Sequence, residues 1–307
     1  VTANDVTLTL TAASTLGSGF YVYIRNTATT ATHEITIVTS GTETIDGWSE
    51  HRIVRRNEGV QLVCDGSNFF SLRSEIDGLA LGYQTDATGD YTTAIGYQAN
   101  ASGTGADAIG GSAFASGSRS LALGGGHATG SNSISISGST FGTNSTASAD
   151  KSIAIGEYSV ASGTQSLALG PYTDATGSAS VALGGSGTQS VGNTSVAIGN
   201  AYASGADSFA AAIANNTSSY GATGANSVAI GYQAKATSSK SVSIGERVNT
   251  TNSYSYSLGS QIDNGGQYSA VLSGYDVTIS GGNYNYAIGT TLDIDAVNGG
   301  MAFGNQS

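Results

Sequence analysis

The stretch SLALGPYTDATGSASVALGG, residues 166–185, states one short pattern twice. A Ser, a large aliphatic residue, Ala, a second large aliphatic residue and Gly precede small residues that end in Thr-Gly, and the pattern then begins again as SVALG. The usual step between copies is fourteen positions, as from Gly156 to Gly170, and two steps are longer at nineteen, so the sequence predicts a repeat architecture. About sixteen copies place their turn residue at Gly82, Gly96, Gly110, Gly124, Ser137, Gly156, Gly170, Gly184, Gly199, Ala212, Gly231, Gly245, Gly259, Ser273, Gly289 and Gly304.

Each copy has the pattern of one coil of a parallel β-roll. Segments such as SLALG and SVAIG alternate with period two, which predicts a short strand. The second half of a copy, such as YSVASG, predicts another short strand and a tight turn. Glycine at a fixed place in every coil supplies the positive φ that such turns need. Successive coils are expected to stack at the strand spacing of about 4.8 Å.

The alternation within a coil separates large from small side chains. Leu121 and Leu123 share one face of a strand, while Ser120 and Ala122 share the other. A coil this short is narrow, so we expect the small faces inside and the large aliphatic residues in a stripe outside. Such a stripe has to be covered. Other copies of the chain, arranged around one axis, would cover it.

Three stretches resemble a known family. SVAIG (227–231), SIAIGEYSVASGTQS (152–166) and ALGPYTDATG (168–177) are similar to the YadA-type head repeat of trimeric autotransporter adhesins, which phage tail fibres also use. The resemblance covers roughly residues 76–307 and implies a left-handed β-solenoid with three chains about one axis, a homotrimer. Ser137, Ala212 and Ser273 depart from it by lacking the turn glycine. Coils from about residue 250 are rich in Tyr and Asn and diverge, so we expect the roll to change shape there.

The N-terminal part of the chain has a different pattern. VTLTL (6–10), FYVYIRN (20–26), HEITIVT (33–39) and VQLVCDG (60–66) are alternating runs separated by turn signals, which predicts a small antiparallel, β-sandwich-like module over residues 1–75. These runs resemble a β-module of phage tail fibre and tailspike proteins. The fold class is therefore all-β, with the module followed by the β-roll over residues 76–307.

The charge and apolar content of the sequence argue against some classes of binding partner. A formal net charge of −11 at pH 7 opposes binding to nucleic acid, because such binding depends on Lys and Arg. No apolar run approaches the roughly 18 residues of a membrane span, so no membrane insertion is expected. Cys64 stands alone in a predicted strand and is expected to be a buried thiol. The chain opens on VTAND without Met, so we expect a fragment or processed product that joins other virion tail proteins through a missing N-terminal part.

Motifs for chemistry are scarce. The three histidines have no metal spacing, and no serine lies in a nucleophile motif with suitable partners. We therefore expect no cofactor, no metal site and no enzymatic activity. Carboxylates paired between neighbouring chains, which would make a glycan-degrading tailspike, remain an open alternative.

The tyrosines provide the candidate site. There are sixteen, and six crowd the last coils. A stacking ladder that stabilises the roll is one interpretation, and a surface for sugars or proteins is the other. The candidate receptor-binding residues are Tyr254, Tyr256, Tyr268, Tyr275, Asn283, Tyr284, Asn285 and Tyr286.

The sequence as a whole predicts attachment. The first hypothesis is a trimeric phage tail fibre that binds a bacterial surface glycan or outer-membrane protein, located in the virion. The alternative is the head of a bacterial trimeric autotransporter adhesin, located on the cell surface. The extra residues of the two longer steps, within 138–151 and 213–226, are predicted to bulge to solvent as loops where recognition residues vary.

Overall fold

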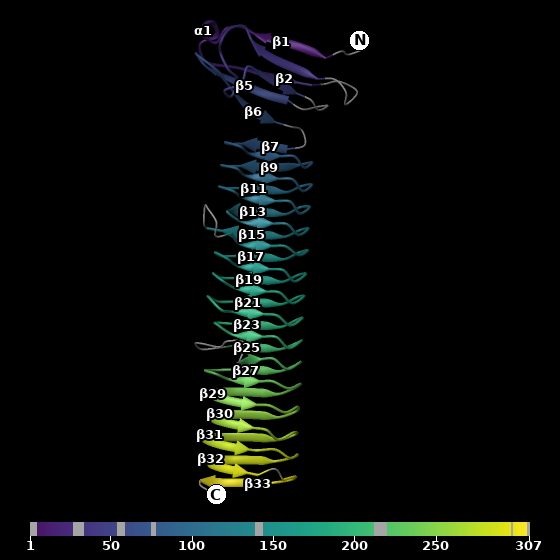
Figure 1. The fold of residues 1–307 in the computed structure, drawn as a ribbon, viewed down its shortest axis with the longest axis vertical. Helices are drawn as coiled ribbons and strands as arrows, with labels where there is room; N and C mark the ends of the chain where they lie inside the picture. The colour runs from purple at the N-terminus through teal and green to yellow at the C-terminus, as the bar shows by residue number, and fades with distance from the viewer. Residues whose placement is uncertain are drawn as a thin grey trace. The chain divides into compact units, whose positions relative to one another are not determined.

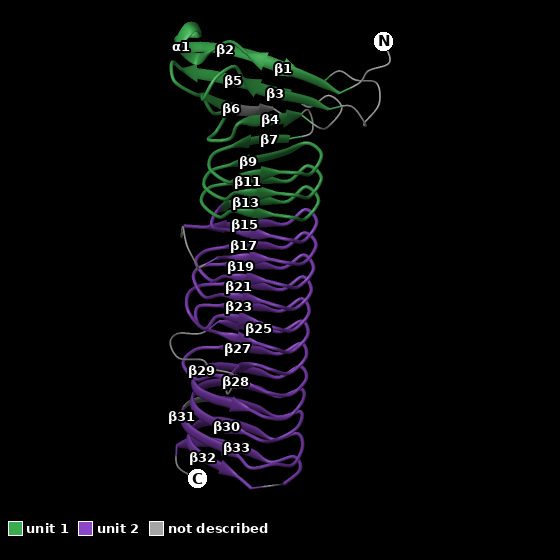
Figure 2. Cartoon of the chain, turned by 45° about the horizontal axis from the view of Figure 1, so that its top comes forward, with its two compact units in different colours: residues 1–123 green, residues 124–307 purple. Residues whose placement is uncertain are grey.

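The computed structural model describes residues 5–26, 34–53, 59–74, 78–138, 144–211, 220–295 and 297–305. It divides into two compact units, residues 1–123 and 124–307, shown in different colours in Figure 2. Each unit is built almost wholly of strands, and the described residues contain a single helix, α1 (Ala13–Leu16). The predicted all-β fold class is confirmed.

The first unit begins with a three-stranded sheet and with a second sheet that continues into the roll. One contains β1 (Val6–Leu10), β3 (Ile35–Thr39) and β4 (Glu50–Ile53). The other contains the antiparallel strands β2 (Ser18–Arg25), β5 (Gly59–Asp65) and β6 (Phe69–Ser74). A shared core contains Ala13, Ile37, Ile45, Ile53, Val60, Leu62, Cys64 and Phe69. The small antiparallel sheets expected in this part of the chain are therefore present, and Cys64 is buried as expected.

One pair of strands in this module differs from the rest. β1 and β3 are parallel, with Val6 opposite Ile35, while β3 and β4 are antiparallel. The chain leaves β1 for β2 in the other sheet before it returns as β3, so it can enter the first sheet again in the same direction. The predicted boundary between module and roll lies at residues 75/76. Residues 75–77 lie outside the described residues, so this boundary stays a prediction.

The roll follows within the first unit. Its first strands are β7 (Gly78–Leu81), β9 (Thr92–Ile95), β11 (Asp107–Ile109) and β13 (Leu121–Gly124), and its second strands are β8 (Asp86–Ala87), β10 (Asn100–Ala101) and β12 (Phe114–Ala115). Parallel partners stand one repeat apart in the sequence, as Ala94 does from Ala108. The predicted register of the repeat is confirmed.

The second unit continues the same alternation of first and second strands (Figure 1). These are β14 (His127–Ala128), β15 (Ile134–Ser137), β16 (Thr146–Ala147), β17 (Ile153–Ile155), β18 (Val160–Ala161), β19 (Leu167–Leu169), β20 (Asp174–Ala175), β21 (Val181–Leu183), β22 (Gln189–Ser190), β23 (Val196–Ile198), β24 (Tyr202–Ala203), β25 (Phe209–Ala211), β26 (Gly221–Ala222), β27 (Val228–Ile230) and β28 (Lys235–Ala236). The two longer steps keep this register, since Ile134 pairs with Ile153. Residues 139–143 and 212–219 of the two predicted loops lie outside the described residues.

Side chains sort by size as the sequence predicts. Ala154 is fully buried, while Ile153 and Ile155 on either side point outward and are partly exposed. The turn glycines are equally constrained. Gly170 has a φ of +121°, and a Cβ there would overlap the carbonyl oxygen of Gly184 in the next coil. The stacked backbones therefore leave no room for a side chain at this corner.

The last coils change shape. β29 (Val242–Thr250), β30 (Tyr256–Asn264), β31 (Ala270–Ile279) and β32 (Tyr286–Ile294) each run through the corner that separates two strands in earlier coils, and β33 (Met301–Asn305) pairs with β32. Their interior contains Val248, Ile262, Val271, Val277, Ile279, Ala287, Leu292 and Ile294. The roll thus changes shape in the last coils, and the first of the long strands already begins at Val242. Over the described residues the roll makes about 15 turns.

A candidate ligand groove on the last coils

Three tyrosines occupy equivalent turns of the last coils. Tyr254, Tyr268 and Tyr284 each lie just before the first strand of a coil and have φ values of 58°, 52° and 62°. The backbone N–H of each donates to a carbonyl of the preceding coil, for example from Tyr284 to Gln267 at 2.9 Å. This turn aims the three side chains outward and stacks them in line.

The three rings form a ladder. The centroids of Tyr254 and Tyr268 lie 5.0 Å apart with an interplanar angle of 17°, and those of Tyr268 and Tyr284 lie 5.3 Å apart at 11°. At one end Lys240 donates from Nζ to the Tyr254 hydroxyl at 3.2 Å, and Nζ lies 4.7 Å from the ring centroid. The three rings are therefore stacked in the arrangement that the ladder interpretation expected, and stacking of this kind limits their movement.

Two further tyrosines stand on the strands beside the ladder. Tyr256 begins β30 and Tyr286 begins β32, and 51% and 42% of their surfaces are exposed. Ala270, the first residue of β31, lies between them in register. Because its side chain is a single methyl group, a groove of about 330 Å³ opens above it. The groove is lined by Tyr254, Tyr256, Tyr268, Ser269, Ala270, Tyr284 and Tyr286.

The floor of the groove is held by hydrogen bonds. Ser269 is buried, and its Oγ donates to the Gln267 carbonyl at 3.0 Å. The backbone N–H of Asn285 donates to the same Oγ at 3.1 Å. The groove therefore has a fixed base, apolar walls and tyrosine hydroxyls around it, a composition suited to a ligand with both apolar and hydroxyl surfaces.

Asn285 does not belong to the exposed surface. It is fully buried, and its Nδ2 donates to the carbonyls of Gly281 and Val297, both at 2.8 Å. Its Oδ1 accepts from the N–H of Gly300 at 2.7 Å. The expectation that Asn285 contacts a receptor is corrected here. Alternation turns it inward between the two outward tyrosines at 284 and 286, and its amide ties the coil together.

Tyr275 and Asn283 lie apart from the groove lining. Tyr275 is 52% exposed at the opposite corner of its coil, beside Thr290 of β32. Asn283 is half-buried, and its backbone N–H donates to Oδ1 of Asn298 at 2.8 Å. Of the eight predicted receptor-binding residues, the groove brings together five, all of them tyrosines.

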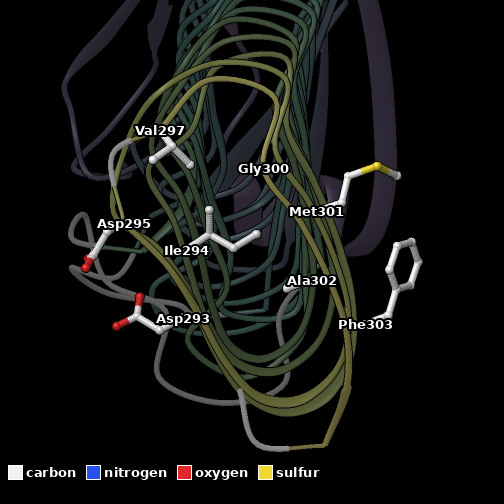
Figure 3. Close-up of a pocket in the computed structure, with 8 residues that line it drawn as sticks. All are labelled: Asp293, Ile294, Asp295, Val297, Gly300, Met301, Ala302 and Phe303. Carbon is white, nitrogen blue, oxygen red and sulfur yellow. The ribbon is translucent and has the colours of Figure 1, made fainter.

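A second hollow lies where β32 and β33 meet. Its lining contains Asp293, Ile294, Asp295, Val297, Gly300, Met301, Ala302 and Phe303. Figure 3 shows the two aspartates on one side of the coil, and Met301 and Phe303 on the other. Ile294 belongs to the core cluster, against which Ala302 packs. This hollow is therefore an edge of the interior, in contrast to the walled groove above Ala270.

The structure was also searched for metal-binding clusters and for membrane-spanning helices. Within the described residues no group of three or more His, Cys, Asp or Glu is placed to hold a metal ion. In the same part of the chain no helix has the length and apolar character needed to cross a membrane.

The model of the YadA head domain repeat matches the chain in several places. The matched segments are residues 74–99, 87–106, 101–126, 141–159, 161–186 and 222–245. The chain thus contains repeats of a kind found in adhesins, in coils of both units, and the resemblance noted in the sequence is supported. The groove residues lie outside these segments. No curated protein sequence matches the chain.

Sequence reasoning did not single out Ala270, Ser269 or Lys240. The aligned repeats nonetheless contain a pattern that marks Ala270. When the copies are aligned on their turn residues, Tyr256, Ala270 and Tyr286 occupy one position, and a small residue there interrupts a row of large ones. Lys240 likewise aligns with Tyr254, Tyr268 and Tyr284.

Proposed function

We propose that this chain is a self-associating, extracellular adhesive segment that attaches its carrier to a receptor on a bacterial surface. One observation supports this most directly: Tyr254, Tyr268 and Tyr284 form an outward ladder at the turns of coils that continue a roll of adhesin-type repeats. Tyrosine offers a large contact area at low cost in conformational entropy, together with a hydroxyl for hydrogen bonding. The ladder holds these three rings in place before any ligand arrives.

The first candidate for the carrier is a phage tail fibre. It is supported by the resemblance of residues 1–75 to a tail-fibre module, and it would locate the chain in the virion. The head of a bacterial trimeric autotransporter adhesin is the second candidate, supported by the matches to the YadA head repeat. The genes beside the coding sequence distinguish the two, because structural phage genes would surround the first and not the second.

Attachment is tested by removing the ladder. Changing Tyr254, Tyr268 and Tyr284 together to Ala should lower binding to host cells while the oligomer persists, because the groove loses one wall. A matched control changes Tyr158 and Tyr172, which stack at 5.0 Å in the middle of the roll away from the groove. Unchanged cell binding with a lower melting temperature would make the ladder a purely structural cap.

We propose a homotrimer as the working form. The large aliphatic residues of the first strands are partly or largely exposed in the single chain, and the accessible fraction is 42% for Leu169, 39% for Ile198 and 46% for Leu258. A stripe of outward large apolar residues is typical of a surface that another chain covers. Three copies around one axis would give every stripe a partner.

The module in the first unit carries a similar face. Tyr21, Val63 and Phe70 stand opposite one another on β2, β5 and β6, and Tyr21 and Phe70 are exposed. β6 pairs in turn with β7, the first strand of the roll, where Leu79 is exposed. In this unit exposed apolar side chains thus occur both on the module and at the start of the roll, which supports self-association through both parts.

The trimer is tested at Leu169. Changing it to Asp would put three carboxylates into a dry interface, where desolvation is costly. Sedimentation should show loss of the trimer, whereas Leu169→Ile should retain it. A folded monomer of the unchanged chain would contradict the arrangement.

We propose that attachment is not accompanied by glycan cleavage. Incubation of the protein with host surface polysaccharide, followed by sizing of the polysaccharide, should leave its length unchanged. Shortened chains would instead support the tailspike alternative.

A further inference from the structure

We propose that two lysine–glutamate contacts between neighbouring copies hold the chains of the oligomer in register. Lys151 of one copy pairs with Glu157 of the next, and Lys240 of one copy pairs with Glu246 of the next. The inference rests on the proposed homotrimer and names the contacts that align its chains. It goes beyond the apolar stripe, because a stripe that repeats in every coil does not fix which coils of two copies lie side by side.

The four charged residues recur together in the sequence. The stretches KSIAIGE (151–157) and KSVSIGE (240–246) each begin with lysine and end with glutamate. Residues 78–307 contain two glutamates, and both stand at the end of these stretches. A lysine at the turn before a first strand also occurs only twice in the aligned repeats, and it occurs in these same two coils. The lysine and the glutamate therefore go together, although six positions separate them.

The two charges of a coil do not meet within one chain. Lys151 lies in the turn before β17 and has a φ of 58°, whereas Glu157 lies in the turn after this strand. An extended strand rises about 3.3 Å per residue, so six residues place the two up to about 20 Å apart. Both side chains are exposed, and neither makes an ion pair with a described residue of its own chain.

The second pair has the same arrangement. Lys240 also has a φ of 58°, and both Lys240 and Glu246 are exposed. The Nζ of Lys240 donates to the Tyr254 hydroxyl at 3.2 Å, which leaves further protons of the ammonium group for a carboxylate. Arg247 follows Glu246 directly, but among the described residues neither of them makes an ion pair. Each coil thus presents a cation at one edge and a carboxylate at the opposite edge.

Cyclic symmetry brings these two edges together. Rotation about one axis turns the direction of each first strand along with its chain, so the strands at one level run head to tail around the axis. The turn before β17 in one copy therefore faces the turn after β17 in the next copy. Lys151 and Glu157 are less than half a coil apart along the roll, which is a difference in height of about 2 Å. A lysine side chain spans this difference easily.

The contacts select one register among many similar ones. Coils repeat about every 4.8 Å, so sliding one copy by a coil would again place aliphatic residues against aliphatic residues. The same slide would set Lys151 opposite Pro171 and Tyr172, and Lys240 opposite Ser260 and Gln261. Both lysines would then lose their carboxylates. Complementary charges at the edge of an interface fix its register in this way.

Direct contact is tested by carbodiimide coupling of the intact oligomer. The carbodiimide activates a carboxylate, a lysine amine in contact with it forms the amide, and a urea leaves. We expect chains that stay linked on a denaturing gel, with mass spectrometry showing Lys151 joined to Glu157 and Lys240 joined to Glu246. The matched control combines Lys151→Arg with Lys240→Arg, which keeps both charges but removes the reactive amines. It should sediment as the parent does and lose both amides.

Exchange of the charges tests the register. Glu157→Lys should lower the melting temperature of the oligomer, because like charges would meet, and the addition of Lys151→Glu should restore it. Ala179→Glu places a carboxylate on the same type of turn two coils further on, so its addition to Glu157→Lys should restore nothing. The loss caused by Glu157→Lys should shrink in high salt, because exposed charges are screened.

The outcomes separate this inference from the proposed homotrimer. A parent chain that sediments as a monomer would reject the homotrimer and the contacts with it. A stable oligomer would reject the contacts alone if no lysine–glutamate amide joined two chains, or if Lys151→Glu failed to restore the melting temperature of Glu157→Lys. An amide between Lys151 and Glu246 would place the chains in another register and would also reject the contacts.

Discussion

The middle and last coils of residues 124–307 share one turn geometry but have different interiors. In the middle coils, Ala147, Ala154, Ala161, Ala168, Ala175 and Ala182 make up one buried cluster. In the last coils the inward positions just after the turn residue hold Val248, Ile262, Val277 and Leu292, where earlier coils have small residues such as Ser159, Thr173 and Ala234. The larger inward residues appear first on the second strand of the coil, while the inward position of the first strand stays small at Ser243 and Ser257 and enlarges only at Val271.

The difference shows that this roll is stabilised in two ways. Burial of a methyl group contributes about 0.8 kcal/mol, whereas a full Val, Leu or Ile side chain contributes about 1.5–3 kcal/mol. Middle coils therefore depend mainly on backbone hydrogen bonds between stacked turns. The last coils add a hydrophobic core, and it is on this better-packed region that the tyrosine groove is built.

Hydroxyl groups join the two interiors. Ser243 donates from Oγ to Oγ1 of Thr250 at 2.8 Å, and Thr250 lies 2.9 Å from Oγ of Ser257. Asn264 donates to the same Ser257 Oγ at 3.2 Å. These four buried polar side chains thus satisfy one another, which a wider but still partly polar interior requires.

The largest expected effect breaks the stacking of the middle coils. A Cβ at Gly163 would overlap the carbonyl of Gly177, whereas at Gly266 it would first meet the side chain of Ser269. Gly163→Ala should therefore lower the free energy of unfolding by more than about 3 kcal/mol, and Gly266→Ala by less. Chemical denaturation measures both. Gly185→Ala, with nothing within 4 Å, is the neutral control. Equal losses at the two glycines would show that both regions stack alike.

A smaller loss of stability is expected when the size of a buried side chain is changed in either region. Ile262→Ala removes most of a fully buried side chain and should destabilise by about 2–4 kcal/mol. Ala168→Val enlarges a fully buried side chain in the narrow interior and should destabilise by about 1–3 kcal/mol. Denaturation midpoints of the two variants report the values. A neutral Ala168→Val would mean that the middle coils have spare interior volume.

In the turn before the first strand, the same substitution to glycine should raise the stability of a middle coil and lower that of a last coil. Ala179 and Tyr268 occupy this turn in a middle and a last coil, with φ values of 53° and 52°. Ala179→Gly relieves a left-handed conformation and should stabilise by up to about 1 kcal/mol. Tyr268→Gly also relieves it but removes two ring stacks worth about 0.5–1.5 kcal/mol each, so it should destabilise. Melting curves that shift in the same direction would show that stacking contributes nothing.

The smallest effect concerns His127 on the outer face of a middle coil. Burial lowers the pKa of this imidazole from its ordinary value of 6.5. The unfolded chain then binds the proton more readily, so the contribution of the neutral ring is present above about pH 6.5 and declines as the pH falls. His127→Thr, which copies its partner Thr146, should show a flatter melting temperature between pH 7.5 and 5. Identical pH profiles would contradict this assignment.

Much of the fold follows from residue spacing. The turn residues set the register, and the pairings of Ile134 with Ile153 and of Ala211 with Ile230 show that even the two longer steps were aligned correctly. Inward alanine and outward leucine follow from alternation alone. The strand pairing of the N-terminal module is harder to predict from the sequence. The parallel pairing of β1 and β3 depends on which sheet β2 joins, and no local sequence pattern encodes that choice.

The candidate site was predictable only in part. Outward tyrosines could be located because they follow the repeat, and five of them meet at the groove. Asn285 was misplaced because an amide among exposed tyrosines resembles a binding residue, while its role is to satisfy buried backbone groups. Ala270 escaped notice because the groove above it is marked by a missing side chain rather than by a chemical group.

The register of the stacked turns also bears on how such a gene can change. Each coil returns the backbone to an equivalent position one strand further along the roll, since partners such as Ala154 and Ala168 are one full repeat apart in the sequence. In-frame duplication or deletion of one repeat by recombination would leave the remaining contacts as they were and alter the reach of the roll by about 4.8 Å. Substitution at a turn glycine, by contrast, disturbs two coils at once. The number of repeats, and with it the length of the roll, can therefore change during evolution without loss of the fold. The turn glycines cannot be substituted as freely.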